Sequence, residues 1–154
     1  MPKPPAYRVR RRPPFFHPVP VRSRRDGWTV ARQCEFLARL YLTGSVSEAA
    51  RAVGMSRASA YRLREREGAE GFAHAWDAIF VPPGMGRIAV PKPDWRKVTS
   101  PTLARRMQTG LVQPLIHRGR IAAIRRKPDN FSMLRLLRRV DAAERAIWKR
   151  EGWV

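Results

Sequence analysis

The chain has 154 residues, which suits one domain of ordinary size or a small domain with appendages. Its 32 Lys and Arg residues outnumber 12 Asp and Glu residues, so the formal net charge is +20 and the isoelectric point is near 11.8. This excess indicates a polyanionic partner, nucleic acid first and an anionic membrane surface second, and the lack of a long apolar run leads us to expect neither a membrane span nor a secretory signal.

Residues 1–27 are predicted to form a disordered basic arm. They hold seven of the 14 prolines and eight Lys or Arg residues against one Asp. Proline prevents helix formation and like charges keep the segment extended. Such an arm can lie along phosphates or enter a minor groove, and a leader without specific contacts is the alternative. The candidate DNA contacts of the arm are Arg8, Arg10, Arg11, Arg12, Arg22, Arg24 and Arg25.

Residues 28–81 are predicted to form a helix-turn-helix DNA-binding domain of low net charge. Its first helix is expected from Thr29 to Leu42, with Thr29 as the cap and Gly44 as the end. Cys34 lies on the apolar stripe of this helix. A lone cysteine there is expected to be buried and reduced, as in a cytoplasmic protein.

The stretch between Val46 and Glu65 has the residue types and spacing of a helix-turn-helix. Ser47 is predicted to cap its first helix, Gly54 to make the left-handed turn, and Ser56 to cap its second helix. Small and medium apolar side chains let the two helices cross closely: Ala49, Ala50, Val53, Met55, Ala60 and Leu63. A plain helical hairpin with a solvated basic face is the alternative interpretation.

The second helix of this motif is predicted to enter the major groove of duplex DNA. Arg can bond guanine with two hydrogen bonds, Ser can bond base edges or phosphate, and Tyr suits backbone contacts. The candidate DNA-binding residues of the motif are Ser56, Arg57, Ser59, Tyr61, Arg62 and Arg64.

A fourth helix is predicted from about Ala69 to Phe80. Its Phe72 and Trp76 are expected to cover the helical core rather than to form a stacking platform, because exposed aromatic residues of that size are unusual. Residues 82–97 are rich in proline and glycine and are predicted to be a linker.

Residues 98–154 are predicted to be a basic hairpin–helix region. A short helix is expected over 101–109, then a hairpin over 112–125 with Arg118-Gly119 as its turn, then a helix to about Lys149. The fold class is therefore mainly α, a helix-turn-helix bundle with a small C-terminal β-hairpin plus helix unit. Asp129 and Asn130 are alternative caps of the last helix. Its apolar face, expected to complete a core or else to form a dimer seam, is Met133, Leu136, Leu137, Val140, Ala143 and Ile147.

No catalytic site, metal site or cofactor site is predicted. The three histidines lie in different predicted segments, and no Cys, His or carboxylate cluster has metal-ligand spacing. A phosphate-binding loop of the Gly-x-x-x-x-Gly-Lys-Ser/Thr type is missing, so any ATP hydrolysis would come from a partner. We therefore expect a binding protein rather than an enzyme.

The order of motifs resembles that of small helix-turn-helix proteins of alphaproteobacteria and their phages, many of them described as terminase-small-subunit-like. The resemblance rests on Ala-Ala-Arg-Ala-Val-Gly-Met-Ser-Arg over 49–57 and on Gly-Phe-Ala-His-Ala-Trp-Asp over 71–77. The hairpin sequence over 114–121 and Met-Leu-Arg-Leu-Leu over 133–137 resemble the same group more loosely. The resemblance implies recognition of phage or phage-like DNA, with an oligomer handing DNA to a large ATPase subunit of the terminase.

The sequence thus predicts a double-stranded DNA-binding protein, a phage- or prophage-related recognition factor or a transcription regulator, in the nucleoid of a bacterial cytoplasm. Charge is uneven, because the helix-turn-helix domain is nearly neutral and both flanks are basic. This division favours base contacts from the domain and phosphate contacts from the flanks. One alternative is a packaging adaptor that forms a homo-oligomer and recruits the large terminase subunit. Another is RNA association driven by charge alone.

Overall fold

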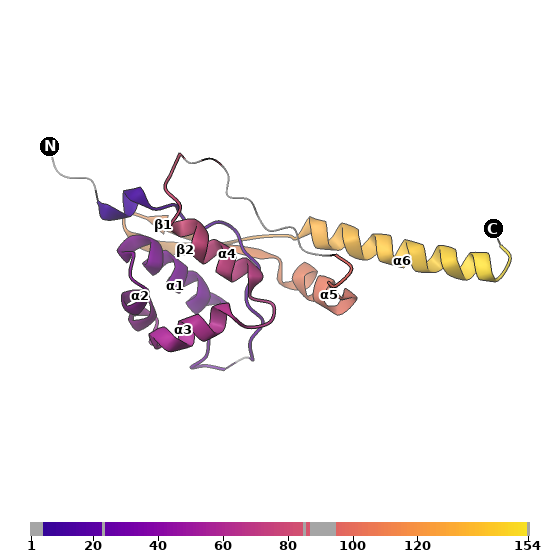
Figure 1. The fold of residues 1–154 in the computed structure, drawn as a ribbon, viewed down its shortest axis with the longest axis horizontal. Coiled ribbons are helices and arrows are strands. Elements are labelled where there is room, and N and C mark those ends of the chain that lie inside the picture. Colours follow the sequence, from indigo (N-terminus) through magenta and orange to yellow (C-terminus); the bar gives the residue numbers. More distant parts are fainter. Residues whose placement is uncertain (1–4, 23, 85, 87–94, 154) are drawn as a thin grey trace. The chain divides into compact units, whose positions relative to one another are not determined.

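The computed structural model describes residues 5–22, 24–84, 86 and 95–153. These residues form a mainly α fold with a two-stranded antiparallel hairpin followed by a C-terminal helix (Figure 1). None of the described helices is long and apolar enough to cross a membrane. Residues 85 and 87–94 of the predicted linker, and 1–4 and 23 of the predicted arm, lie outside the described residues. The elements are η1 (Ala6–Val9), α1 (Val30–Thr43), α2 (Val46–Ala52), α3 (Arg57–Arg64), α4 (Glu70–Ile79), α5 (Ser100–Thr109), β1 (Leu111–His117), β2 (Arg120–Lys127) and α6 (Asn130–Arg150).

The chain divides into two compact units. Unit 1 comprises Met1–Val90 and Leu111–Arg126, and unit 2 comprises Pro91–Gly110 and Lys127–Val154. The hairpin therefore belongs to the same unit as α2 and α3. The predicted domain boundaries had instead placed it with the last helix. The physical reason is that β1 buries one face, including Val112 and Ile116, against α1.

Unit 1 has an aromatic core centred on α1. Phe36 of α1 lies 5.5 Å from Trp28, 6.0 Å from Phe72 and 5.0 Å from Trp76, measured between ring centroids. All four side chains are at most 6% exposed. The prediction that Phe72 and Trp76 are core residues is confirmed, and the cluster of rings joins α4 to α1 and to the segment before α1.

The helix ends follow the predicted chemistry with one exception. Thr29 caps α1, Gly44 ends it at φ +69°, and Ser56 caps α3. The predicted cap of α2, Ser47, is wrong, because Ser45 takes that role and accepts a hydrogen bond from the Glu48 backbone N–H. Because the left-handed Gly44 turns the chain sharply, α2 already begins at Val46, and Ser45 rather than Ser47 stands at its N-cap.

The N-terminal segment, residues 5–22, is not a disordered arm. Phe16 and Val19 are each 2% exposed, and Phe16 forms an antiparallel bridge with Val112 of β1. Gln33 of α1 accepts from the Val19 N–H at 2.8 Å and donates to the Val19 carbonyl at 3.1 Å. Extended proline-rich backbone suits a sheet edge, and apolar residues between the prolines bury the segment.

Gly71 shows how closely this segment approaches α4. A Cβ added at Gly71 would lie 2.9 Å from the backbone nitrogen of His17, so only glycine leaves room for the crossing chain. The N-terminal segment is therefore built into unit 1 on two sides.

The hairpin turn was predicted correctly. Arg118 has φ +49° and Gly119 has φ +75°, the pair of left-handed residues that a two-residue turn needs. β1 and β2 form the whole of their sheet among the described residues, and the N-terminal segment covers the other edge of β1 at Phe16.

In unit 2, α5 packs against α6 and buries Leu103. Thr99 caps α5, and Asp129, one of the two predicted caps, caps α6. The predicted packing of the α6 apolar face into a core is wrong for the described residues, since Leu137, Val140 and Ile147 are 52%, 50% and 41% exposed. α5 is short and covers too little of a 21-residue helix to bury that face.

Candidate nucleic-acid interface

The turn between α2 and α3 has the glycine and the serine cap that the sequence predicts there. Gly54 has φ +75° and its N–H donates to the Arg51 carbonyl at 3.0 Å, while the Met55 N–H donates to the Ala50 carbonyl at 2.9 Å. The Ser56 hydroxyl accepts from the Ser59 N–H at 3.0 Å and so caps α3. The inner faces of both helices are buried, and these residues are Ala49, Ala50, Val53, Ala60 and Leu63. The outer face of α3 is thereby held in a fixed direction.

The outer face of α3 carries two cations and an aromatic ring. Arg57, Tyr61 and Arg62 are exposed, with Arg57 and Tyr61 at i and i+4 on one face of the helix and Arg62 next to Tyr61 in the chain. The Tyr61 ring lies 5.2 Å from the Trp76 ring, and the Arg57 guanidinium lies 5.5 Å from the Tyr61 centroid. Packing on Trp76 fixes the Tyr61 ring, and all three side chains are exposed.

Three further residues of the motif have partners inside the protein. Ser56 is the helix cap, and Ser59 accepts a hydrogen bond at 2.8 Å from the Trp28 indole. Arg64 donates to both carboxylate oxygens of Asp77 at 3.1 and 3.2 Å and lies 4.8 Å from the Trp76 ring centroid. These contacts hold α3 on unit 1, so their first role is to position the helix.

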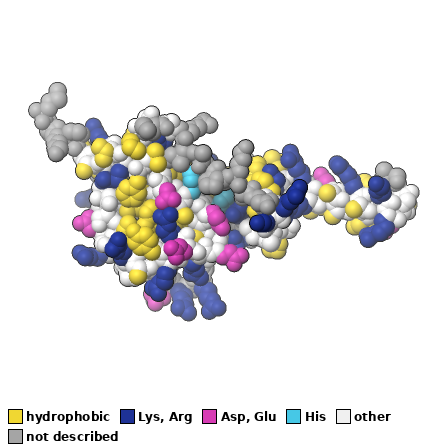
Figure 2. Space-filling model, viewed as in Figure 1, with side chains coloured by type: hydrophobic (Ala, Val, Ile, Leu, Met, Phe, Trp, Pro, Cys, Tyr) yellow, Lys and Arg dark blue, Asp and Glu magenta, His cyan; other side chains and the backbone are white. Residues whose placement is uncertain are grey.

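The segment before α1 lies beside α3. The Trp28–Ser59 hydrogen bond joins the two elements, and Figure 1 shows the segment passing α3. Arg22, Arg24 and Arg25 are exposed there. In Figure 2, Lys and Arg side chains gather at the lower edge of unit 1, where Figure 1 places α3 and this segment.

The other four arginines of the predicted arm lie elsewhere. Arg10 donates to the Tyr41 and Leu42 carbonyls at 2.6 and 3.0 Å. These carbonyls lie at the C-terminal end of α1, a 14-residue helix about 20 Å long. Arg10 is therefore far from the N-terminal end of α1, where Trp28 bonds Ser59 of α3. Arg11 donates to the Val81 and Pro82 carbonyls just after α4. Arg8 and Arg12 are exposed next to them in the chain, so the structure does not bring these four to α3.

Sequence reasoning missed Arg51. It is exposed on α2 and, with Arg57, lines a depression of about 410 Å³ at the turn, together with Ser47, Gly54, Met55 and Ser56. The signal was available, because Arg51 lies inside the motif, six residues before Arg57. A cation from each helix at one hollow suits a phosphate group.

The one cysteine of the chain, Cys34 of α1, is buried. Burial raises the pKa of the Cys34 thiol from 9.0 to about 12, against a smaller lowering by Arg126. Among the described residues, no group of three or more His, Cys, Asp or Glu side chains could hold a metal ion.

Comparison of the chain with protein-family models, curated proteins and solved structures gives no match.

Proposed function

We propose that this protein binds double-stranded DNA, with α3 in the major groove. The observation that carries the proposal is the outer face of α3, where Arg57, Tyr61 and Arg62 are presented by a helix with a buried inner face. A major groove admits one α-helix, and arginine is the most frequent reader of guanine. Residues 28–81, which contain α3, hold seven basic and six acidic residues, so the cations of α3 stand on a nearly neutral segment.

Phosphate contacts are assigned to groups beside α3. Arg51 and Ser47 flank its N-terminal end, and Arg22, Arg24 and Arg25 lie in the segment that Trp28 holds against it. Arg10, Arg11 and Arg64 are left out of the proposed interface, because protein atoms already accept their hydrogen bonds.

The proposal is tested by selecting bound sequences from random duplex DNA with the full-length protein at near-physiological salt. We expect an enriched motif, and we expect Arg57→Ala or Arg62→Ala to cost about 1–3 kcal/mol on it and to relax the preference. Arg39→Ala on α1 is the control of equal charge change, and it should leave the preference intact. Binding without enrichment by the unaltered protein would contradict base readout by α3.

A terminase-like packaging adaptor is a second candidate, favoured by one observation. Leu134, Leu137, Val140 and Trp148 of α6 are each about half exposed, as expected of a helix that meets another chain. In this role α6 would build an oligomer, and a large ATPase subunit would supply the hydrolysis. Leu137→Asp should then abolish an oligomer that forms without DNA, measured by sedimentation. An oligomer unaffected by Leu137→Asp would count against this role.

A further inference from the structure

The arginines of α6 fall into two groups by their partners. Arg139 donates to the carbonyls of Trp95 and Val98 at 2.9 and 2.6 Å and to the Ser100 hydroxyl at 3.1 Å. It therefore ties the 95–100 segment to α6. Arg135 and Arg138 have no hydrogen bond or ion pair within the part of the chain that the structure describes.

Arg135 is nevertheless held in place. Its guanidinium lies 3.9 Å from the Trp95 ring centroid and 5.1 Å from that of Phe131, and the two rings are 4.9 Å apart. Its Nε is buried and lacks a hydrogen-bond partner, alone in this among the side-chain atoms of the described residues. Leaving a buried charged donor unpaired is costly, which points to a purpose other than stability.

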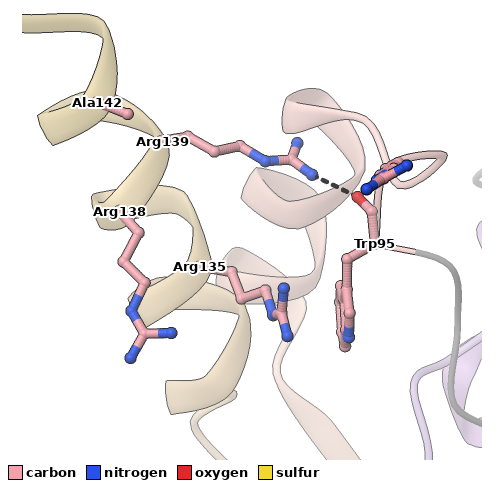
Figure 3. Close-up of a pocket in the computed structure, with 6 residues that line it drawn as sticks. Trp95, Arg135, Arg138, Arg139 and Ala142 are labelled. Carbon is pink, nitrogen blue, oxygen red and sulfur yellow. Dashed lines mark hydrogen bonds between the residues drawn. The ribbon is translucent and has the colours of Figure 1, made fainter.

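These side chains line one shallow cavity of unit 2 that is open to solvent. It has a volume of about 560 Å³ and is lined by Trp95, Arg96, Arg135, Arg138, Arg139 and Ala142. Figure 3 shows Arg135 and Arg139 pointing from α6 toward Trp95. Four of the six lining residues are arginines and none is acidic, so the cavity is strongly positive.

We propose that this cavity binds a phosphate group. A single carboxylate is satisfied by one guanidinium, whereas a phosphate offers several acceptor oxygens and can engage two or more arginines at once. Stacking on Trp95 fixes the plane of the Arg135 guanidinium before the ligand arrives, which lowers the entropy cost of binding. The phosphate can belong to a nucleic-acid backbone or to a free phosphate compound, and the site is independent of the α3 interface.

The test measures binding of the full-length protein to two probes, a fluorescein-labelled random 20-base-pair duplex over a range of salt and inorganic pyrophosphate by calorimetry. The double variant Arg135→Gln/Arg138→Gln is compared with Arg145→Gln/Arg150→Gln, which removes the same charge from the exposed end of α6. If the site binds the nucleic-acid backbone, the first variant should reduce the slope of log K against log salt concentration by nearly two, at about 0.9 per phosphate contact. The control variant should reduce this slope by less than one. For a free phosphate compound, pyrophosphate binding should fall at least tenfold in the first variant only, with duplex binding equal in both.

Arg135→Lys separates a built site from simple charge. It keeps the charge and loses the stacked fork, so we expect it to lose part of the binding that the double variant loses, with circular dichroism showing an intact α6. Full binding by Arg135→Lys, equal effects of the two double variants, or stronger competition by polyglutamate than by duplex would each overturn the proposal. Failure of the α3 interface is distinguishable, because Arg57→Ala changes sequence preference and the α6 variants should not.

Discussion

The helices α3 and α6 both expose arginines, but they are held in different ways. α3 has eight residues, and Ala60 and Leu63 fix it on the aromatic core of unit 1. α6 has 21 residues, of which only Ser132 is buried among those described, and polar bonds from Arg139 tie the 95–100 segment to it. Apolar packing, together with the polar bonds of Ser59 and Arg64, therefore positions the candidate DNA-reading surface, whereas hydrogen bonds and stacking with little apolar burial position the proposed phosphate site.

The largest expected effect comes from Phe16→Ala. This side chain is 2% exposed and meets the Phe72 ring at 6.0 Å, so its removal should cost about 3–5 kcal/mol of unfolding free energy. Urea denaturation followed by near-ultraviolet circular dichroism measures it. Leu137→Ala on α6 should cost less than about 0.5 kcal/mol, because a half-exposed side chain loses little on truncation. Similar costs for the two changes would mean that the contrast between the units is wrong.

Gln33→Leu tests the only buried glutamine of the described core. Its amide bonds the Val19 N–H, the Val19 carbonyl and the Trp28 carbonyl, and all three backbone groups would lose their partner. We expect a loss of about 2–4 kcal/mol, since each unpaired buried group costs about 1–3 kcal/mol. Gln108→Leu on the exposed side of α5 is the control, and denaturation midpoints compare the two. A loss no larger than that of the control would show that the N-terminal segment docks by apolar contacts alone.

Arg139→Met addresses unit 2. It removes the bonds to Trp95, Val98 and Ser100 and should cost about 1–3 kcal/mol of local stability. Because these bonds join two segments, the effect should appear as faster amide hydrogen exchange over 95–100 and not in unit 1. Arg145→Met, whose side chain is exposed, should leave the exchange unchanged. Protection that survives Arg139→Met would mean that Trp95 and Phe131 suffice to hold the segment.

Gly71→Ala sets helix propensity against packing. Alanine is favoured over glycine within a helix by about 1 kcal/mol. At this position the added Cβ would meet the His17 nitrogen at 2.9 Å and the His17 carbonyl at 3.3 Å, both backbone atoms that cannot rotate away. We expect a net destabilisation of about 1 kcal/mol, as for modest overpacking, measured by thermal unfolding. Stabilisation would mean that the backbone at His17 moves away from the added methyl group at little energetic cost.

Local signals were sufficient to predict most of the helices. Thr29, Gly44, Gly54 and Ser56 act through contacts within four residues, so the sequence places them well. The Arg118-Gly119 turn is equally local.

Apart from the cap of α2, the main errors concern partners farther away in the chain. Phe16 pairs with Val112, some 96 residues later, and no local pattern distinguishes that segment from a disordered arm. The same holds for Arg64, whose partner Asp77 is on α4, and for Arg10, which bonds the end of α1. Composition indicated a basic surface, but only tertiary structure separates arginines bonded within the protein from those left for a ligand.

The smallest expected effect is the contribution of Cys34, in the buried core of unit 1, to the pH dependence of the unfolding free energy. Burial raises the pKa of its thiol to about 12 in the folded protein, from 9.0. The unfolded chain therefore ionises first, so this group's contribution is complete below pH 9 and is lost as pH rises from about 9 toward 12. At pH 10 the loss should be about 1 kcal/mol, at 1.36 kcal/mol per pKa unit. Unfolding free energies at pH 8 and pH 10 should therefore differ less in Cys34→Ala than in the unaltered protein. Since Cys34 is the only cysteine, an equal difference in both proteins would mean that the core of unit 1 admits water to the thiol.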